Sequence, residues 1–220
     1  MAKSKGKAVK LRSVASKRAP QPRALQSEKR REAILAAALE EFSSCGFAAA
    51  RLDDVARRAG VAKGTIYLHF RDKEMLFQEL VRAELSPVVA ALEGAPMSDL
   101  PMRVIAERLI ELFVREIFQS RRKDVIRLIL TEGPRFPAIA EFYYREVVEH
   151  VMVVIRRLAQ KAVERGELPN DSLVRFPQLL GAPGIVAIIW SGLFDRWAKL
   201  DAEAFMRAYL DLVFGQGKAA

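Results

Sequence analysis

The sequence predicts an all-α fold in two parts. Apolar residues recur at three- and four-residue steps from Ser27 almost to the end of the chain, as in amphipathic helices. No stretch alternates apolar and polar residues for long, so no sheet is expected. A Gly-, Pro- and Ser-rich stretch over residues 93–101 is interpreted as the seam between an N-terminal and a C-terminal region. With 220 residues, of which 51% are hydrophobic, the chain can bury a real core.

The N-terminal region is expected to contain three short-to-medium helices and the start of a long one. Ser27 can cap the first helix, which Gly46 ends. A short helix is predicted over residues 52–59, closed by Gly60, and a third over residues 62–70. Arg71 and Asp72 then open a long helix.

The C-terminal region is expected to form five helices, over residues 102–119, 123–132, 138–165, 173–194 and 202–214. Residues 176–194 are nineteen consecutive uncharged residues, which is the length of a membrane span. Pro and Gly residues interrupt this run and charged helices flank it, so a buried interface helix is favoured. A second copy of the chain is the simplest cover for such a helix, which predicts a homodimer and no membrane contact.

The net charge of +9 is unevenly placed. Residues 1–26 carry eight Lys or Arg and no acidic residue, whereas the rest of the chain is close to neutral. A run of this kind predicts a disordered basic arm that adds non-specific affinity for DNA. A plain solubilising tail and an organellar transit peptide are the alternatives.

Several classes of chemistry find no support. One cysteine excludes an intrachain disulfide and a zinc site built on several thiolates, and with two histidines neither a metal nor a cofactor is expected. Cys45 is interpreted as a small buried apolar residue. There is no Gly-rich phosphate loop, no G-x-S-x-G and no H-E-x-x-H, so the chain is not predicted to be an enzyme.

The predicted helices over residues 52–59 and 62–70, joined by "GV", have the helix-turn-helix pattern. Apolar residues are expected to lock the pair together: Val55, Ala56, Val61, Ile66 and Phe70. The outer face is left with Lys63, Gly64, Thr65, Tyr67 and His69. Ammonium, hydroxyl and imidazole groups suit phosphate oxygens and base edges, so this face is a candidate DNA-binding surface.

The string "RLDDVARRAGVAKGTIYLHFRDKEMLFQEL", residues 51–80, resembles the DNA-binding segment of the TetR (tetracycline-repressor-like) regulators. The resemblance implies base and backbone contacts at Lys63, Gly64 and Thr65. It implies phosphate contacts at Tyr67, His69 and Lys73, with a structural role as the alternative for His69. Members usually carry Thr or Ser before the second helix, where this chain has Ala50 and Arg51. Arg51 can replace the phosphate contact by its charge, but it cannot cap the helix. Asp53 and Asp54 can offset the missing cap through their interaction with the helix dipole.

The string "RLILTEGPRFPAIAEFYYREVV", residues 127–148, resembles the ligand-binding region of the AefR-like subgroup. The resemblance implies a helix-turn-helix DNA-binding domain over residues 27–72 and a C-terminal ligand-binding and dimerisation domain over residues 73–220. The candidate ligand residues are Leu109, Phe113, Ile129, Phe142, Tyr143, Val147 and Trp190. Their apolar character predicts an apolar or amphipathic effector, although the same residues can form a filled core.

The function expected from these features is that of a cytoplasmic, nucleoid-associated repressor. A homodimer would bind a palindromic double-stranded DNA operator and be released by a small molecule. The alternative is a DNA-organising or cell-division protein of the same fold without ligand control.

Overall fold

The computed structural model describes residues 22–95 and 99–214, with side chains from Gln26 onward. Within these ranges every regular element is helical, which confirms the all-α prediction. In chain order the elements are α1 (Pro22–Ala49), α2 (Leu52–Arg58), α3 (Lys63–His69), α4 (Lys73–Gly94), α5 (Met102–Phe113), the π-helical turn η1 (Val114–Phe118), α6 (Arg122–Glu132), α7 (Pro137–Tyr143), the π-helical turn η2 (Tyr144–Val148), α8 (Glu149–Glu164), α9 (Ser172–Arg175), α10 (Gln178–Leu193) and α11 (Ala202–Phe214).

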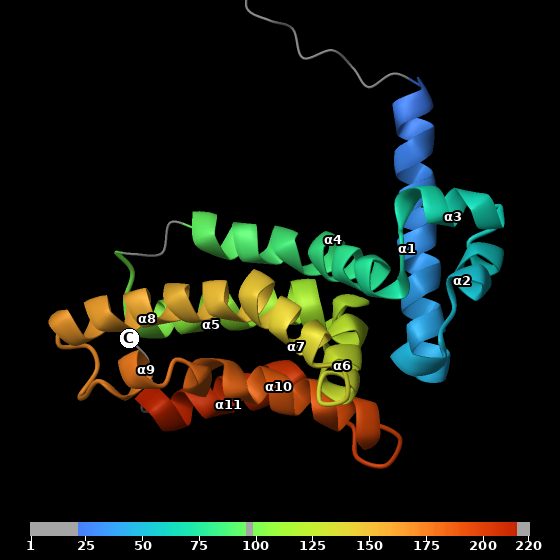
Figure 1. Cartoon of the computed structure of the whole chain (residues 1–220). Coiled ribbons are helices and arrows are strands. Elements are labelled where there is room, and N and C mark those ends of the chain that lie inside the picture. Colours follow the sequence, from blue (N-terminus) through green and yellow to red (C-terminus); the bar gives the residue numbers. More distant parts are fainter. Residues whose placement is uncertain (1–21, 96–98, 215–220) are drawn as a thin grey trace, which may run out of the picture.

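Two parts of the molecule are arranged around α1 and α4 (Figure 1). Helices α2 and α3 pack beside α1, on the side away from the remaining helices. Helix α4 leads from this N-terminal unit to the C-terminal helices, which stack in layers beneath it. The helix-turn-helix is thus held at one end of the molecule with its α3 side open.

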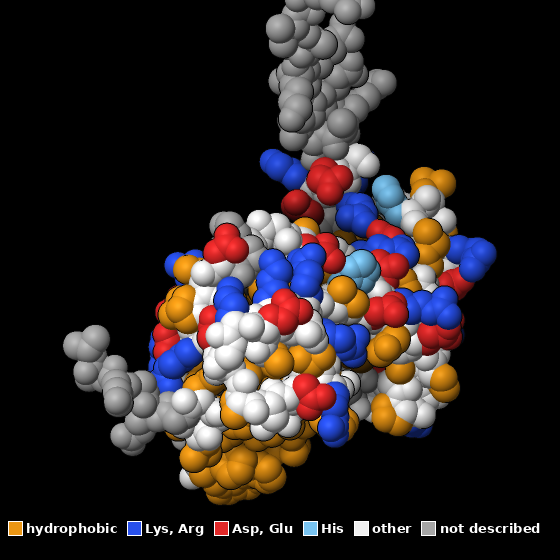
Figure 2. All heavy atoms as spheres, turned by 90° about the vertical axis from the view of Figure 1, so that its left-hand side faces the viewer, with side chains coloured by type: hydrophobic (Ala, Val, Ile, Leu, Met, Phe, Trp, Pro, Cys, Tyr) orange, Lys and Arg blue, Asp and Glu red, His pale blue; other side chains and the backbone are white. Residues whose placement is uncertain are grey.

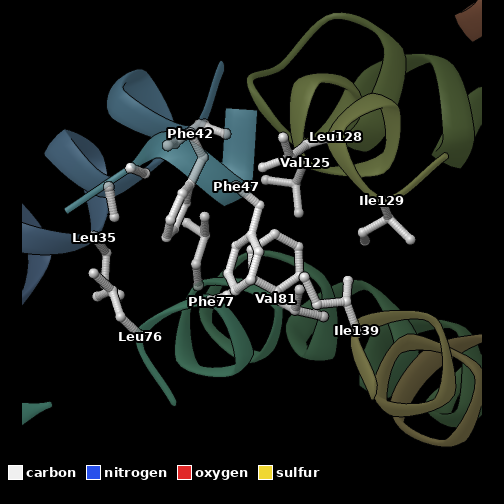
Figure 3. Close-up of a cluster of buried hydrophobic side chains, with 14 of the residues drawn as sticks. Leu35, Phe42, Phe47, Leu76, Phe77, Val81, Val125, Leu128, Ile129 and Ile139 are labelled. Atoms are coloured by element: carbon white, nitrogen blue, oxygen red, sulfur yellow. The ribbon is translucent and has the colours of Figure 1, made fainter. Parts of the chain in front are cut away.

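One apolar cluster joins the two parts. Figure 3 shows side chains of α1 and α4 meeting side chains of α6 and α7 without a break. The labelled members are Leu35, Phe42 and Phe47 before α2, Leu76, Phe77 and Val81 on α4, and Val125, Leu128, Ile129 and Ile139 on the C-terminal side. Because a close-packed core transmits displacements rather than absorbing them, α1 and α6 are mechanically connected.

The start of α1 differs from the prediction. The helix begins at Pro22, so Ser27 lies inside it and is not its cap. The predicted basic arm lies outside the described residues, except for residues 22–26, which are helical. The predicted break at Gly46 is present, since that residue has φ 77° and ψ 163°, a conformation that favours glycine. A last turn then continues to Ala49.

The helix predicted over residues 173–194 also differs from the prediction. It is divided at Phe176 and Pro177, where the uncharged run begins, into the short α9 and the longer α10, because proline has no backbone N–H and disfavours helix at the residue before it. None of the described helices combines the length and the apolar character needed to cross a bilayer. The predicted boundaries of the last helix, residues 202–214, are those of α11.

Candidate nucleic-acid interface

Helices α2 and α3 pack through the residues that the sequence predicts. Val55 and Ala56 on α2 are buried, as are Ile66 on α3 and Phe70 just after it. Gly60 closes α2 with φ 66°, which turns the chain sharply toward α3. The helix-turn-helix therefore forms by burying one face of each short helix.

The outer face of α3 is open. Lys63, Gly64 and Tyr67 are exposed, whereas Thr65 and His69 are half-buried. A Cβ added at Gly64 would meet no atom within 4 Å, so this turn of the helix presents bare backbone. Such a surface lets another molecule approach the main chain closely.

Sequence reasoning missed Leu68, which is 85% exposed on the same face. Its position four residues after Gly64 places it one helical turn above that glycine, so helical spacing was the signal that could have found it. An apolar side chain with this exposure is available for apolar contacts with a partner.

Asp53 on α2 brings two of the predicted site residues together, which the sequence did not indicate. Its carboxylate accepts a hydrogen bond from Lys63 Nζ at 2.7 Å and one from the Tyr67 hydroxyl at 3.2 Å. The hydrogen bond that Lys63 donates to Asp53 lowers the pKa of the Asp53 carboxyl, and the same bond raises the pKa of the Lys63 ammonium. Both groups are therefore charged at neutral pH.

Arg51 occupies the N-cap position of α2 without a side-chain cap, as its chemistry predicts. Asp53 and Asp54 lie in the first turn, where carboxylates interact favourably with the helix dipole. Arg57 pairs with Asp54 at 2.6 Å on the exposed surface, while Arg58 pairs with Glu41 at 2.9 Å and ties α2 to α1.

Lys73 lies at the junction of α1 and α4. Asp72 caps α4 by accepting from the Met75 amide at 2.8 Å. The Lys73 ammonium donates to the carbonyls of Phe47 at 2.9 Å and Ala48 at 2.6 Å. Two of its three donors thus satisfy carbonyls at the end of α1, a role that helical spacing did not reveal.

The prediction that Cys45 is buried is wrong. Cys45 is exposed in the last turn before Gly46. Partial desolvation and the neighbouring Glu41 carboxylate raise the pKa of its thiol, which disfavours the reactive thiolate. Among the described residues, no three His, Cys, Asp or Glu side chains are grouped so that they could hold a metal ion.

The predicted ligand residues do not form one lining. Ile129 and Val147 are buried in the cluster that joins the two parts, and Phe113, Phe142 and Tyr143 pack against it. Leu109 packs against a separate cluster beneath α8. Trp190 lies apart, 36% exposed on α10, where its indole donates to the Ala198 carbonyl at 2.6 Å.

Tyr143 carries the one hydroxyl of this set. Burial raises its pKa to about 12, and no hydrogen bond to its hydroxyl is found among the described residues. A cleft of about 530 Å³ lies elsewhere, between α1 and α6, and none of the seven predicted ligand residues lines it. Its walls are Leu39, Glu40, Ser43, Arg121, Asp124, Arg127, Leu128 and Thr131.

Two protein families match the chain. Residues 34–80 match the family described as "Bacterial regulatory proteins, tetR family", and residues 101–175 match the "AefR-like transcriptional repressor, C-terminal domain". The first match covers the helix-turn-helix and the second covers α5 through α9.

Known proteins are similar over most of the chain. The HTH-type transcriptional regulator YhgD of Bacillus subtilis is 36% identical over 196 residues, which are 87% of this chain and 97% of that protein. A SmeT–triclosan complex has a TM-score of 0.70 at 20% identity, over 84% of this chain and 89% of that one. FadR of Bacillus subtilis in complex with stearoyl-CoA has a TM-score of 0.65 at 18% identity, over 84% and 99%. The helix-turn-helix, the two family matches and the close relative agree that this chain belongs to the TetR family of DNA-binding transcriptional regulators.

Proposed function

We propose that the protein is a dimeric repressor that binds a palindromic operator and is released by a small apolar or amphipathic molecule. The observation that carries this proposal is the open outer face of α3, which points away from the C-terminal helices (Figure 1). In helix-turn-helix proteins the second helix enters the major groove, and a dimer sets two such helices roughly 34–36 Å apart or somewhat more.

The DNA contacts are assigned within this proposal to Arg51, Lys63, Gly64, Thr65, Tyr67, His69 and Lys73. Lys63, Gly64 and Tyr67 have the exposure that such contacts require. Lys73 keeps one ammonium donor beyond the two carbonyls it already binds, and that donor can meet a phosphate. The domain boundary after residue 72 then separates DNA recognition from regulation.

Dimerisation is assigned to α10 and α11. Exposed apolar side chains at Leu179, Val186, Ile189 and Leu193 form a stripe on α10, and Leu212 is exposed on α11. Figure 2 shows hydrophobic side chains gathered at the lower end of the molecule, where α10 and α11 lie in Figure 1. A second copy would cover this surface through a two-fold contact.

The C-terminal interior supports an amphipathic effector. Tyr143 is half-buried and packs against the apolar cluster, so its hydroxyl offers one hydrogen-bonding group to a ligand. The π-helical turns η1 and η2 directly follow Phe113 and Tyr143, and such turns are frequent at functional sites. SmeT with triclosan and FadR with stearoyl-CoA are relatives by fold that bind molecules of this character.

Regulation is assigned to the apolar cluster that joins α1 and α4 to α6 and α7. A ligand that fits the C-terminal interior better in one arrangement of these helices would shift the position of α1. The distance between the two α3 helices would change, and DNA affinity would fall by the ligand's differential affinity, typically about 1–3 kcal/mol.

A binding assay tests the proposal. An operator is selected from random duplexes with the purified protein, and its affinity is followed by fluorescence anisotropy while apolar metabolites, triclosan and stearoyl-CoA are added. We expect a palindromic operator and at least one compound that weakens binding about 5- to 150-fold. The DNA-organising alternative is favoured if the protein binds a palindromic operator but no compound weakens that binding or raises the thermal stability of the protein.

Sedimentation tests the dimer separately. The free protein should sediment at twice the chain mass of 24.7 kDa, and Val186→Glu on α10 should make it monomeric. Val153→Glu introduces the same charge at an exposed apolar position on α8 and should leave the dimer intact. A monomeric wild-type protein would contradict the assignment of α10 and α11.

A further inference from the structure

An acidic side chain lies within the surface that faces DNA. Asp53 is 44% exposed at its side chain and holds the ammonium of Lys63 and the hydroxyl of Tyr67 at once. These contacts join the first turn of α2 to α3, and all three side chains are accessible to solvent. A carboxylate repels phosphate, so its presence among cationic and hydroxyl contacts requires an account.

Stability does not provide that account. An exposed ion pair adds little to folding, because water screens it and two side chains must be ordered. The α2–α3 contact is already maintained by buried Val55, Ala56 and Ile66. The arrangement therefore matters for what Lys63 and Tyr67 can do, rather than for whether the two helices pack.

We propose that Asp53 is a positioning residue that determines specificity, by holding Lys63 and Tyr67 in place and by opposing contacts that involve phosphates alone. Non-specific complexes depend almost entirely on cations that neutralise phosphates. In such complexes the Asp53 carboxylate keeps the Lys63 ammonium engaged and repels the phosphate backbone of the DNA. In the operator complex the two side chains are already oriented on α3, and base contacts compensate for the carboxylate. Discrimination then comes from weakening the wrong complex more than the right one.

The inference rests on the proposed DNA-facing role of α3, and substitution of Asp53 by Asn tests it. Asp53→Asn keeps the size of the side chain and removes its charge. For random duplexes, we expect affinity to rise at least about threefold and the salt dependence to steepen by nearly one phosphate contact, since Lys63 is freed. Operator affinity should change less, so the ratio of specific to non-specific affinity should fall.

Asp54→Asn is the matched control. It removes the same charge one residue along α2, where the carboxylate pairs with Arg57 instead of α3. Asp53→Glu retains the charge and should restore much of the selectivity, while circular dichroism melting checks that each variant folds. The inference is overturned if Asp53→Asn and Asp54→Asn change the affinity ratio and the salt dependence equally, or if neither changes them. A wild-type protein with no preferred sequence would overturn the role of α3 as well, which distinguishes the two failures.

Discussion

Lys73 reaches back from the first turn of α4 to Phe47 at the end of α1. Its ammonium donates to the Phe47 carbonyl at 2.9 Å and lies 4.9 Å from the centroid of the Phe47 ring. A cation in the first turn of a helix opposes that helix's dipole, but here it satisfies carbonyls at the end of another helix. Lys73 thus stabilises the junction on which the placement of the helix-turn-helix depends.

This arrangement predicts that Lys73→Ala has two separable effects. The free energy of unfolding should fall by about 1–2 kcal/mol, because the carbonyls of Phe47 and Ala48 lose a charged donor. The slope of log affinity for DNA against log salt should become shallower by about 0.9, because one phosphate contact is lost. Lys73→Gln keeps an amide donor and should change the slope with a smaller loss in urea denaturation. An unaltered slope in both variants would assign Lys73 a structural role alone.

We expect a substitution at Gly64 to change the stability of the protein and its affinity for DNA in opposite directions. Gly64→Ala should stabilise the fold by up to about 1 kcal/mol, because alanine favours helix and its Cβ meets no atom within 4 Å. Operator affinity should fall, since the methyl group keeps the α3 backbone away from DNA. Gly94→Ala, at the end of α4 and equally unobstructed, is the control that should leave DNA binding unchanged. Full affinity in Gly64→Ala would show that the α3 backbone does not approach DNA closely.

Phe136 lies in the turn between α6 and α7, and we expect it to make the N-terminal and C-terminal parts unfold together. Its ring meets Phe47 edge to face at 4.9 Å between centroids. Phe136→Ala should lower the free energy of unfolding by about 2 kcal/mol and broaden or divide the single urea transition expected of the wild type. Phe205→Ala removes a half-buried ring on α11 that packs against the separate cluster of α5, α10 and α11, and it should keep one sharp transition. Equal sharpness in the two variants would show that Phe136 does not couple the parts.

The sequence predicted the helix-turn-helix well because its signals are local. Val55, Ile66 and Phe70 follow helical spacing, and Gly60 supplies the positive φ that separates the two helices. The break at Pro177 was missed because the prediction relied on the long uncharged run. Proline cannot continue a helix without losing a backbone hydrogen bond, and that signal was given too little weight.

Contacts of polar side chains with distant parts of the chain could not be predicted in this way. The pairing of Asp53 with Lys63 spans two helices, and that of Lys73 with the end of α1 spans 26 residues. Neither leaves a periodic pattern, because periodicity reports only which face of a helix is buried. The predicted ligand residues illustrate the same limit, since apolar spacing places Leu109 and Phe113 inward but into different clusters.

We expect the exposed Leu68 to give the protein a preference for thymine at one position of the operator, which can be tested by removing a single methyl group. An exposed leucine on a recognition helix can contact the C5 methyl group of thymine, which distinguishes A·T from T·A in the major groove. Replacing one operator thymine by uracil removes only that methyl group and should weaken wild-type binding by about 0.8 kcal/mol, roughly fourfold. Leu68→Ala should bind the two duplexes equally, and its thermal stability should match the wild type because the side chain is 85% exposed. Every thymine of the operator is replaced in turn. A methyl group whose loss weakens the wild type and Leu68→Ala equally is contacted by another residue. If every methyl group behaves in this way, Leu68 does not contact a thymine methyl group.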